Sequence, residues 1–424
     1  MKDSAGNKAT KEERPGVLII VENLPVPFDR RVWQEACALR DSGYDVAVIC
    51  PKMRGFTEAE EVLEGIQIYR HWIAPEASGI FGFIAEYASA LFGEMRCAIK
   101  AFRRRRYQVI HLCNPPDLLF LVALPFKFLF RSKVIFDVHD LWPEMFEAKF
   151  RRRGLFYWAV RMFERLTLAT ANVVIATNQS VLKAVKERGN KSDRDTFVVR
   201  TAPKDLDTNV PVNSELKNSR KHLVGYVGVM GDADGVDYVI RAAHHLVNKL
   251  GRTDIQFLLM GSGPEYEKLV ALKDELGLQD YVTMPGRVSN EDLFKGLKTM
   301  DIGVTSDPIN AYNDHCTMNK VLEYMAFGKP QVMFGTVEGR VSAGDAAVYV
   351  MENSAEKLGE AIVELMDDPA KREKLGAIGA KRLHEELNWE RSTAQLQAAY
   401  QMALNNTAPQ PASAAISPAS PETT

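Results

Sequence analysis

Short apolar segments alternate with amphipathic helical segments along most of this 424-residue chain, and the alternation begins again near residue 221. The first half opens with the strand-like GVLIIVENLP at 16–25, and the second opens with HLVGYVGVMG at 222–231. Such alternation is typical of parallel sheets with helices on both faces. The chain is also too long for one ordinary domain. We therefore predict an α/β fold with two Rossmann-like domains that face each other across a cleft.

Changes in composition indicate the domain boundaries. A polar segment with two prolines, RTAPKDLDTNVPVNSELKNSRK, separates the halves, and the chain ends in a stretch rich in proline, alanine and serine that is typical of disorder. We expect a polar N-terminal tail at 1–15, a first Rossmann-like domain at 16–202, a linker at 203–220, a second Rossmann-like domain at 221–385, a C-terminal helix at 386–404 that packs back toward the first domain, and a disordered tail at 405–424.

Charge and composition exclude several classes of protein. The formal net charge of −2 gives no indication of a nucleic-acid partner. The five cysteines are scattered without metal-ligand spacing, which fits a reducing cytosol. The N-terminus lacks the apolar core of a signal peptide, and the longest apolar run, LLFLVALPFKFLF, is interrupted by Pro125 and Lys127. We expect a cytoplasmic protein, peripheral at the inner face of a membrane.

Polar loops follow the predicted strands of both halves. Ligands of open parallel sheets bind outside the carboxyl ends of the strands, so these loops predict the site. The most informative one is NDHCTMNKVLEYMAFGKP at 313–330, where a polar loop leads into a helix with apolar residues at spacings of three and four. Gly328 and Pro330 end that helix.

Several of these motifs together resemble one family. NKVLEYMAFGKP, GYVGVMGDADGVDYVIRAA, LMGSGPEYEKL and YVTMPGRVSNEDL are similar to the donor-binding half of the family 4 (group 1) retaining glycosyltransferases of GT-B fold. PFDRRVWQEACALRDSGYDV and FDVHDLWPE resemble the acceptor half of a bacterial polysaccharide-type subgroup. The resemblance covers about 16–400. It implies that 16–202 binds the acceptor and 221–385 binds a nucleoside-diphosphate sugar, which is transferred with retention and without a metal or other cofactor.

The resemblance also implies donor-binding residues. Backbone N–H groups at the start of the helix after the 313–330 loop would bind the diphosphate, since a helix N-terminus favours an anion. Lys320 adds positive charge there, and Glu323 takes the place of a carboxylate that accepts hydrogen bonds from ribose hydroxyls. The alternative is an ordinary amphipathic helix whose Lys320 and Glu323 are solvated. The implied donor-binding set is Gly228, Gly231, Gly263, Arg287, Thr317, Met318, Asn319, Lys320 and Glu323.

The sequence departs from the family pattern at three positions. The family often has a second glutamate eight positions before Glu323, and His315 stands there instead. His315 and Asp314 are therefore candidates for contact with the sugar, although His315 as a plain loop histidine is the alternative. Where the family often has an arginine and a lysine, this chain has Val229 and Asp234.

The diphosphate therefore requires positive charge from elsewhere. Arg30, Arg31 and Lys320 are the available cations. We favour Arg31, because FDRRV fits a common D-x-R-V pattern and a guanidinium binds phosphate oxygens in a fork. The alternative is a surface arginine paired with Asp29 or Glu35.

His139, in FDVHD, lies where the family often places a histidine beside the donor sugar. Retaining transfer builds positive charge at the sugar carbon and negative charge on the leaving phosphate, which a histidine can stabilise without acting as nucleophile. Asp140 and Glu144 would orient His139 or the acceptor. No carboxylate is assigned as a covalent nucleophile. The resemblance implies front-face transfer, in which the leaving phosphate helps to deprotonate the acceptor, and we expect His139, Arg31 and Glu323 to form the catalytic set.

Two basic and aromatic segments lie in the first half, at 101–108 and 149–163. They are typical of an interfacial anchor for anionic lipid, although aromatics in the core beside a solvated arginine face are the alternative. The predicted partners are a nucleotide-sugar donor, a glycan or lipid-linked acceptor and an anionic membrane surface, with no nucleic acid. A nucleotide-sugar epimerase of the same architecture and a non-catalytic scaffold in glycan assembly are the alternative functions.

Overall fold

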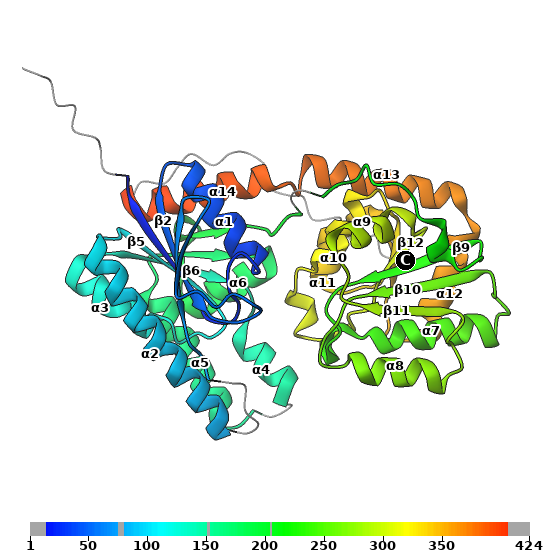
Figure 1. Ribbon diagram of the computed structural model, residues 1–424, viewed down its shortest axis with the longest axis horizontal. Coiled ribbons are helices and arrows are strands. Elements are labelled where there is room, and N and C mark those ends of the chain that lie inside the picture. The colour runs from blue at the N-terminus through cyan, green and yellow to red at the C-terminus, as the bar shows by residue number, and fades with distance from the viewer. Residues whose placement is uncertain (1–13, 75–79, 151–152, 204–205, 406–424) are drawn as a thin grey trace, which may run out of the picture.

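The computed structural model describes residues 14–74, 80–150, 153–203 and 206–405, which form two α/β domains side by side (Figure 1). The first contains an eight-stranded sheet in the order β3-β4-β2-β1-β5-β6-β7-β8, and the second a six-stranded sheet in the order β11-β10-β9-β12-β13-β14. β1 and β9 are the first strands of their domains along the chain, and each lies inside its sheet. β1 lies between β2 and β5, and β9 lies between β10 and β12. The predicted pair of Rossmann-like domains is confirmed.

The first domain is parallel throughout the strand pairs described, except where β3 pairs with β4 in antiparallel fashion. The sequence did not indicate β3, because its EEVL segment is polar and only partly buried. The strands are β1 (Gly16–Val21), β2 (Asp45–Pro51), β3 (Glu60–Leu63), β4 (Ile66–His71), β5 (Val109–Cys113), β6 (Lys133–Val138), β7 (Val173–Ala176) and β8 (Thr196–Val198). The helices are α1 (Arg30–Asp41), α2 (Ile80–Arg104), α3 (Phe120–Phe130), α4 (Trp142–Phe150), α5 (Leu155–Thr170) and α6 (Gln179–Gly189).

The second domain has only parallel strand pairs among the residues described. Its strands are β9 (His222–Val227), β10 (Ile255–Met260), β11 (Val282–Gly286), β12 (Ile302–Thr305), β13 (Gln331–Phe334) and β14 (Ala347–Val350). Its helices are α7 (Val236–Asn248), α8 (Tyr266–Glu275), α9 (Asn290–Thr299), α10 (Asn319–Ala326), α11 (Val337–Ala343), α12 (Ala355–Asp367) and α13 (Pro369–Glu385).

The last helix, α14 (Trp389–Asn405), returns from the second domain to the first (Figure 1). Its buried Leu396, Ala399 and Tyr400 join the core formed by one face of the first sheet and α1. The chain therefore crosses between the domains twice, once after β8 and once before α14. Residues 1–13 and 406–424, which include most of the two predicted tails, lie outside the described residues.

The local sequence explains how α1 and α6 begin at the strand ends. The Asp29 carboxylate accepts a hydrogen bond from the Val32 N–H and caps α1, and the Asn178 side chain caps α6 by accepting from the Val181 N–H. Each cap satisfies an N–H group that has no partner inside its helix. Both helices start beyond the carboxyl ends of strands of the first sheet, where these meet the loops of the second domain. Both caps lie next to site residues.

Candidate functional site

Five contacts between described residues join the strand-end loops of the two domains. The Asn178 amide donates to the His315 carbonyl at 2.7 Å and to the Thr317 hydroxyl at 2.9 Å. Arg30 pairs with Glu323, the Arg287 guanidinium lies 4.9 Å from the centre of the Phe28 ring, and the Tyr312 hydroxyl lies 3.5 Å from an Asp140 oxygen. Residues predicted on the two halves are thus brought together at one place.

The helix α10 begins at this meeting point. Met318 has extended backbone and precedes the first helical residue, Asn319. The first N–H groups of a helix have no acceptor within it, and the aligned peptide dipoles make this end attractive to an anion. Thr317 is fixed by Asn178 of the other domain. Thr317, Met318 and Asn319 are therefore placed where an anionic group between the domains would meet them.

Lys320 is buried among groups that neutralise it. Its ammonium donates to both Asp307 oxygens, at 2.9 and 3.1 Å, and lies 3.3 Å from the Tyr226 hydroxyl and 3.5 Å from an Asp234 oxygen. Burial alone would lower the pKa of Lys320, but these partners raise it above its ordinary value. Two carboxylates offset one ammonium here, so this loop of the second domain supplies little net positive charge.

Glu323 is one turn further along α10 and faces the first domain. Its carboxylate accepts from Arg30 Nη1 at 3.3 Å. The side chain of Glu323 is 10% exposed and that of Arg30 is 63% exposed, so the pair lies at the mouth of a buried site. Burial raises the pKa of Glu323, while Arg30 opposes that rise. A ligand hydroxyl that replaced Arg30 would find a carboxylate acceptor in place.

Arg31 does not lie where the sequence motif suggested. Its Nε and Nη2 donate to the two Asp137 oxygens at 2.9 and 2.7 Å, and its Nη1 donates to the Val199 carbonyl at 2.7 Å. Glu35, one turn along α1, lies 3.1 Å from Nη2. Because every guanidinium nitrogen already has a buried partner, the prediction that Arg31 binds the diphosphate directly does not fit this arrangement.

The two arginines lie in different surroundings. Arg30, which we expected to be the lesser cation, reaches the second domain at Glu323, and Arg31 belongs to the interior of the first domain. The alternative pairing of Arg31 with Glu35 is present, but the Arg31 side chain is buried rather than on the surface.

His139 lies directly after β6 and is held by that strand. Its Nε2 lies 2.7 Å from Asp137 Oδ2, and its backbone N–H donates to the Asn114 side chain at 2.7 Å. Burial lowers the pKa of His139, but the Asp137 carboxylate outweighs it and the pKa is raised. With Nε2 bound to Asp137, Nδ1 is the ring nitrogen available to a substrate.

Asp137 and Asn114 hold His139 in place, and the sequence interpretation did not single them out. Asp137 is fully buried in an apolar strand, KVIFDV, and a charged residue at such a position is a usable signal of a paired or functional group. Asn114 gave no comparable signal. It follows β5, and its amide also donates to Asp117.

The other acids near His139 are placed differently from each other. Asp140 points toward Tyr312 of the second domain, and burial raises the pKa of its carboxyl. Glu144 forms an ion pair with Arg188 of α6 instead of approaching His139. The suggestion that Glu144 orients His139 or the acceptor is therefore not supported by its contacts.

The sugar-contact candidates lie in the turn before α10. The Asp314 carboxylate accepts from the Val337 N–H at 3.0 Å, so Asp314 anchors the start of α11. His315 Nδ1 is buried and has no hydrogen-bond partner among the described residues. His315 Nδ1 is thus a buried polar atom without a partner in the described part of the chain, whereas Asp314 uses one carboxylate oxygen to hold the start of α11.

Glycines in the loops after β9 and β10 let the backbones of these two loops pack closely together. A side chain at Gly263 would meet the Met230 carbonyl at 2.5 Å, so this glycine packs the loops after β9 and β10 together. Gly228 has φ +154, and a side chain there would press on Lys320. The Gly231 N–H donates to the Asp234 carboxylate. These three glycines shape the loop that carries Asp234.

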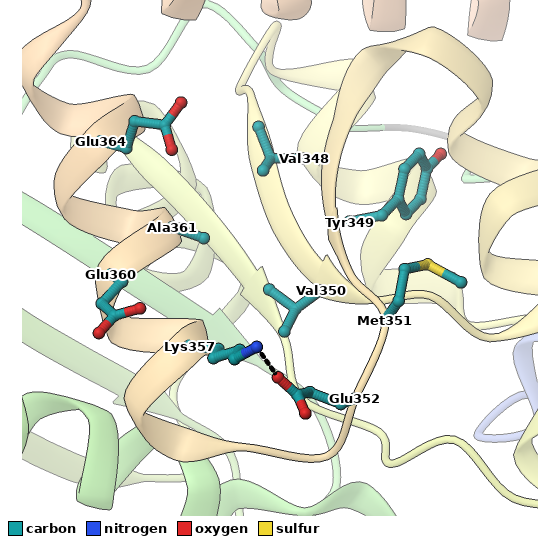
Figure 2. Close-up of a pocket in the computed structure, with 9 residues that line it drawn as sticks. All are labelled: Val348, Tyr349, Val350, Met351, Glu352, Lys357, Glu360, Ala361 and Glu364. Carbon is teal, nitrogen blue, oxygen red and sulfur yellow. Dashed lines mark ion pairs between the residues drawn. The ribbon is translucent and has the colours of Figure 1, made fainter. Parts of the chain in front are cut away.

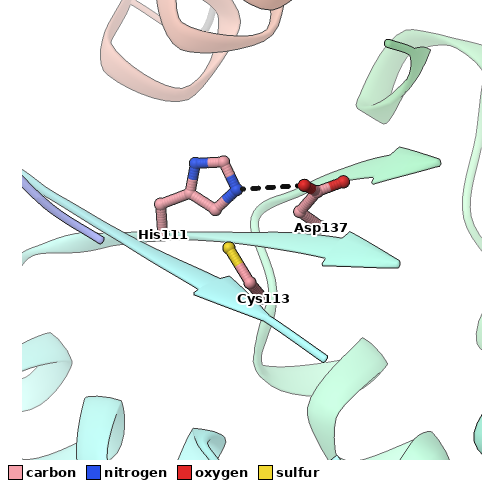
Figure 3. A group of neighbouring side chains, drawn as sticks. All are labelled: His111, Cys113 and Asp137. Atoms are coloured by element: carbon pink, nitrogen blue, oxygen red, sulfur yellow. Dashed lines mark ion pairs between the residues drawn. The ribbon is translucent and has the colours of Figure 1, made fainter. Parts of the chain in front are cut away.

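A buried group with metal-ligand atoms, drawn in Figure 3, includes the Asp137 carboxylate that also contacts His139. One ligand atom from each of His111, Cys113 and Asp137 lies within 4.8 Å of the others. The Arg31 guanidinium already occupies both Asp137 oxygens, and burial raises the pKa of the Cys113 thiol well above its ordinary value. A metal cation at Asp137 would lie against the Arg31 guanidinium, so these residues do not fit a metal centre.

A surface hollow of about 550 Å³ lies elsewhere, between β14 and α12 (Figure 2). Its lining includes the Lys357–Glu352 ion pair, Glu360 and Glu364. None of the predicted site residues lines it. We assign the site to the meeting strand ends, because polar side chains of both domains converge there.

Two family profiles match this chain. One described as "Glycosyl transferase 4-like domain" matches residues 29–199, and one described as "Glycosyl transferases group 1" matches residues 221–368. The two matches correspond to the two domains.

Similar proteins were found among curated sequences and solved structures. An alpha-D-kanosaminyltransferase of Streptomyces kanamyceticus is 26% identical over 53% of this chain and 57% of its own length. A GDP-mannose-dependent monoacylated alpha-(1-6)-phosphatidylinositol monomannoside mannosyltransferase of Corynebacterium glutamicum is 30% identical over 37% of this chain and 41% of its own length. The chain thus spans about half the length of these relatives. Sucrose-phosphate synthase from Thermosynechococcus elongatus has a similar fold, with a TM-score of 0.75 and 19% identity over 93% of this chain and all of that one.

Proposed function

This chain belongs to the group 1 glycosyltransferases of GT-B fold, and on that premise we propose that it transfers a sugar from a nucleoside-diphosphate sugar to a glycan or lipid-linked acceptor in polysaccharide biosynthesis. The observation that carries the proposal is the contact between Glu323, beside the start of α10, and Arg30 of the first domain. It brings an anion-binding helix end and a carboxylate acceptor to the strand ends that hold His139. The mannosyltransferase relative is named for a nucleotide-sugar donor and a lipid acceptor.

Different site residues bind different parts of the donor. The diphosphate lies against the N–H groups of Thr317, Met318 and Asn319. The ribose hydroxyls donate to Glu323 and displace Arg30, whose guanidinium is then available to a phosphate oxygen. Arg287 stays near this junction through its contact with Phe28. Positive charge thus reaches the diphosphate largely from outside the Lys320 cluster, where Asp307 and Asp234 neutralise the ammonium.

We propose that transfer proceeds with retention on the front face of the sugar. The acceptor hydroxyl oxygen forms a bond to the anomeric carbon on the side from which the diphosphate leaves. The bond between that carbon and the phosphate oxygen breaks, and the acceptor proton passes to the leaving phosphate. His139 Nδ1 contacts the sugar or the phosphate and stabilises the charges that develop. An inverted anomeric configuration in the product, measured by NMR, would exclude this route.

The proposal includes transfer without a metal, as the family resemblance implies. We expect transfer measured by mass spectrometry to be unchanged after treatment with EDTA. The control adds magnesium or manganese back at millimolar concentration. Loss of activity with EDTA and recovery with either ion would contradict metal-free transfer.

We expect Glu323→Gln to weaken donor binding while leaving the fold intact. The change removes an ionised acceptor from the ribose, and hydrogen bonds to charged groups contribute about 1.5–3 kcal/mol, equivalent to roughly 10- to 150-fold in affinity. A thermal-shift screen of nucleotide sugars selects the donor, and calorimetry then measures its affinity for both proteins. The control is Glu364→Gln, at an exposed carboxylate that lines the surface hollow between β14 and α12 and lies outside the site. Equal donor affinity for the wild type and Glu323→Gln would remove the basis of the assignment.

The acceptor side of the proposal includes a membrane surface. Adjacent helices α2, α3 and α5 of the first domain expose large apolar side chains, and arginines stack on some of them, such as Arg106 on Phe130. Apolar side chains beside basic residues suit an anionic lipid surface. In the part of the chain that the structure describes, no helix is long and apolar enough to cross a bilayer. The exposed residues are Phe92, Ile99, Leu121, Phe128, Leu129, Phe130, Leu155, Phe156, Trp158, Met162 and Leu166.

We expect the double variant Phe128→Glu/Leu129→Glu to bind anionic vesicles at least tenfold more weakly than the wild type. These side chains are 75% and 76% exposed, and burying one such side chain contributes about 1.5–3 kcal/mol. Co-sedimentation with phosphatidylglycerol-containing vesicles measures the effect. Met351→Glu, at a side chain of the second domain that is 61% exposed, is the matched control. Similar sedimentation of all three proteins would show that this surface does not bind membranes.

A non-catalytic scaffold is the second candidate, because Asp234 and Asp307 neutralise the lysine that would otherwise contact the diphosphate. Slow hydrolysis of the donor without acceptor separates the two candidates. An enzyme produces free sugar and nucleoside diphosphate, whereas a scaffold that binds the same nucleotide produces neither.

A further inference from the structure

The C-terminal helix α14 contributes one polar side chain to the interior of the first domain. The Tyr400 hydroxyl lies 2.8 Å from His111 Nδ1, and both residues are completely buried. Leu396, Ala399 and Met402 of the same helix contribute apolar packing to the same core. Hydrophobic packing alone would accept a phenylalanine in place of Tyr400, so the hydroxyl requires a separate explanation.

The hydrogen bond from Tyr400 fixes the state of the histidine. When the hydroxyl donates to Nδ1, the proton of neutral His111 is on Nε2. That nitrogen lies 3.7 Å from Asp137 Oδ2 and 3.8 Å from a Glu35 oxygen. His111 therefore directs an N–H toward the carboxylate that also holds His139, at a distance longer than a hydrogen bond, so the two groups interact through charge and dipole alone.

Asp137 connects this interior group to the candidate catalytic residue. Its Oδ2 lies 2.7 Å from His139 Nε2 and accepts from Arg31 Nε at 2.9 Å. The direction of the His139 ring, and the strength with which His139 holds its proton, thus depend on how the negative charge of Asp137 is shared. The charged and titratable groups that face His139 are Asp29, Arg31, Glu35, Asp137 and Asp140.

We propose that Tyr400 is a positioning residue for His139, acting through His111 and Asp137. The inference rests on the proposed function, because it assigns to α14 a part in that same reaction. It makes the helix that returns from the donor-binding domain a component of the acceptor-side site as well as a packing element. The line of contacts runs from Tyr400 on α14, through β5 and β6, to the strand end where His139 meets the substrate.

The experiment replaces Tyr400 by phenylalanine, which keeps the ring and removes the hydroxyl. Without that hydroxyl, His111 shares less of the Asp137 charge, so His139 binds its proton more tightly. We expect the His139 pKa, measured by NMR of ¹⁵N-labelled histidine and assigned by loss of the signal in His139→Ala, to rise by about half to one unit. In the transfer assay, kcat should fall about 3- to 10-fold with KM unchanged. The pH profile of kcat should move to higher pH, as the His139 pKa does.

The matched control is Tyr44→Phe, because the Tyr44 ring lies 5.5 Å from that of Tyr400 and shares its packing. This variant should keep the wild-type His139 pKa and the wild-type rate. An unchanged His139 pKa in Tyr400→Phe would overturn the inference, even if the rate falls, because the hydroxyl would then be only structural. Should the protein show no transfer with any donor, the proposed function fails, while the NMR titration still decides whether Tyr400 controls His139.

Discussion

Arg31→Ala is expected to lower the free energy of unfolding of the first domain by about 3–5 kcal/mol, because it leaves buried carboxylates without their cation. Asp137 accepts two hydrogen bonds from Arg31, and Glu35 lies 3.1 Å from the same guanidinium. Both carboxylates are completely buried. The sequence motif predicted a loss of transfer rate from this change. The structure predicts a loss of stability first, with the rate falling as a consequence.

Denaturant titration followed by circular dichroism measures the change, and Arg30→Ala is the matched control on the adjacent residue. Arg30 is 63% exposed and has one contact to Glu323, so its loss should change stability by less than about 1 kcal/mol. If Arg31→Ala keeps wild-type stability but loses transfer rate, the result would favour the prediction that Arg31 binds the diphosphate. It would also show that the domain interior tolerates the unpaired acids.

The phase of helix α1 explains why Arg31 is buried and Arg30 is exposed. Successive residues of a helix point about 100° apart, so only one of two neighbouring arginines can face the sheet. Val32, Ala36 and Leu39 are buried, and Arg31 and Glu35 lie one turn apart beside that face. The sequence contained this information, but a short motif match does not use it.

Other parts of the fold and the site could be predicted because they depend on local patterns. The strands β1, β9 and β12 are apolar runs, and α10 has both its periodicity and its glycine stop. The antiparallel β3 could not, since EEVL depends on its partner strand rather than on its own composition. Contacts between distant segments were also hidden. Nothing local to Tyr400 indicates His111, which lies 289 positions away in the chain.

The acids around Lys320 are a second case in which the sequence did not reveal the contacts between charged groups. Asp234 was visible as a departure from the family pattern, but its distance of 3.5 Å from Lys320 Nζ required the fold. Asp307 lies before the loop that leads into α10. It pairs with Lys320 at 2.9 Å, a shorter distance than that of Asp234. The charge of a site is a sum over groups brought together by folding, so the sequence indicated each charge and not their balance.

His139→Ala is expected to reduce kcat by about 10²–10³ while the protein stays folded. His139 offers Nδ1 to the reacting groups, and removal of one preorganised electrostatic contact has an effect of this size. Stability should change little, because Asp137 keeps both of its hydrogen bonds from Arg31 when the histidine is lost. This prediction gives the same carboxylate one partner for stability, Arg31, and one partner for the reaction, His139.

Transfer rates and donor affinity, measured for His139→Ala and for His139→Gln, test this division. Glutamine can still donate to Asp137 but cannot carry a proton in the way imidazole does, so it should preserve stability and donor binding without restoring kcat. If glutamine restores the rate, hydrogen bonding rather than charge is what His139 provides. A large fall in stability for His139→Ala, with kcat per folded molecule unchanged, would instead assign His139 to the folded core together with Arg31, and the reaction would depend on other residues at the domain junction.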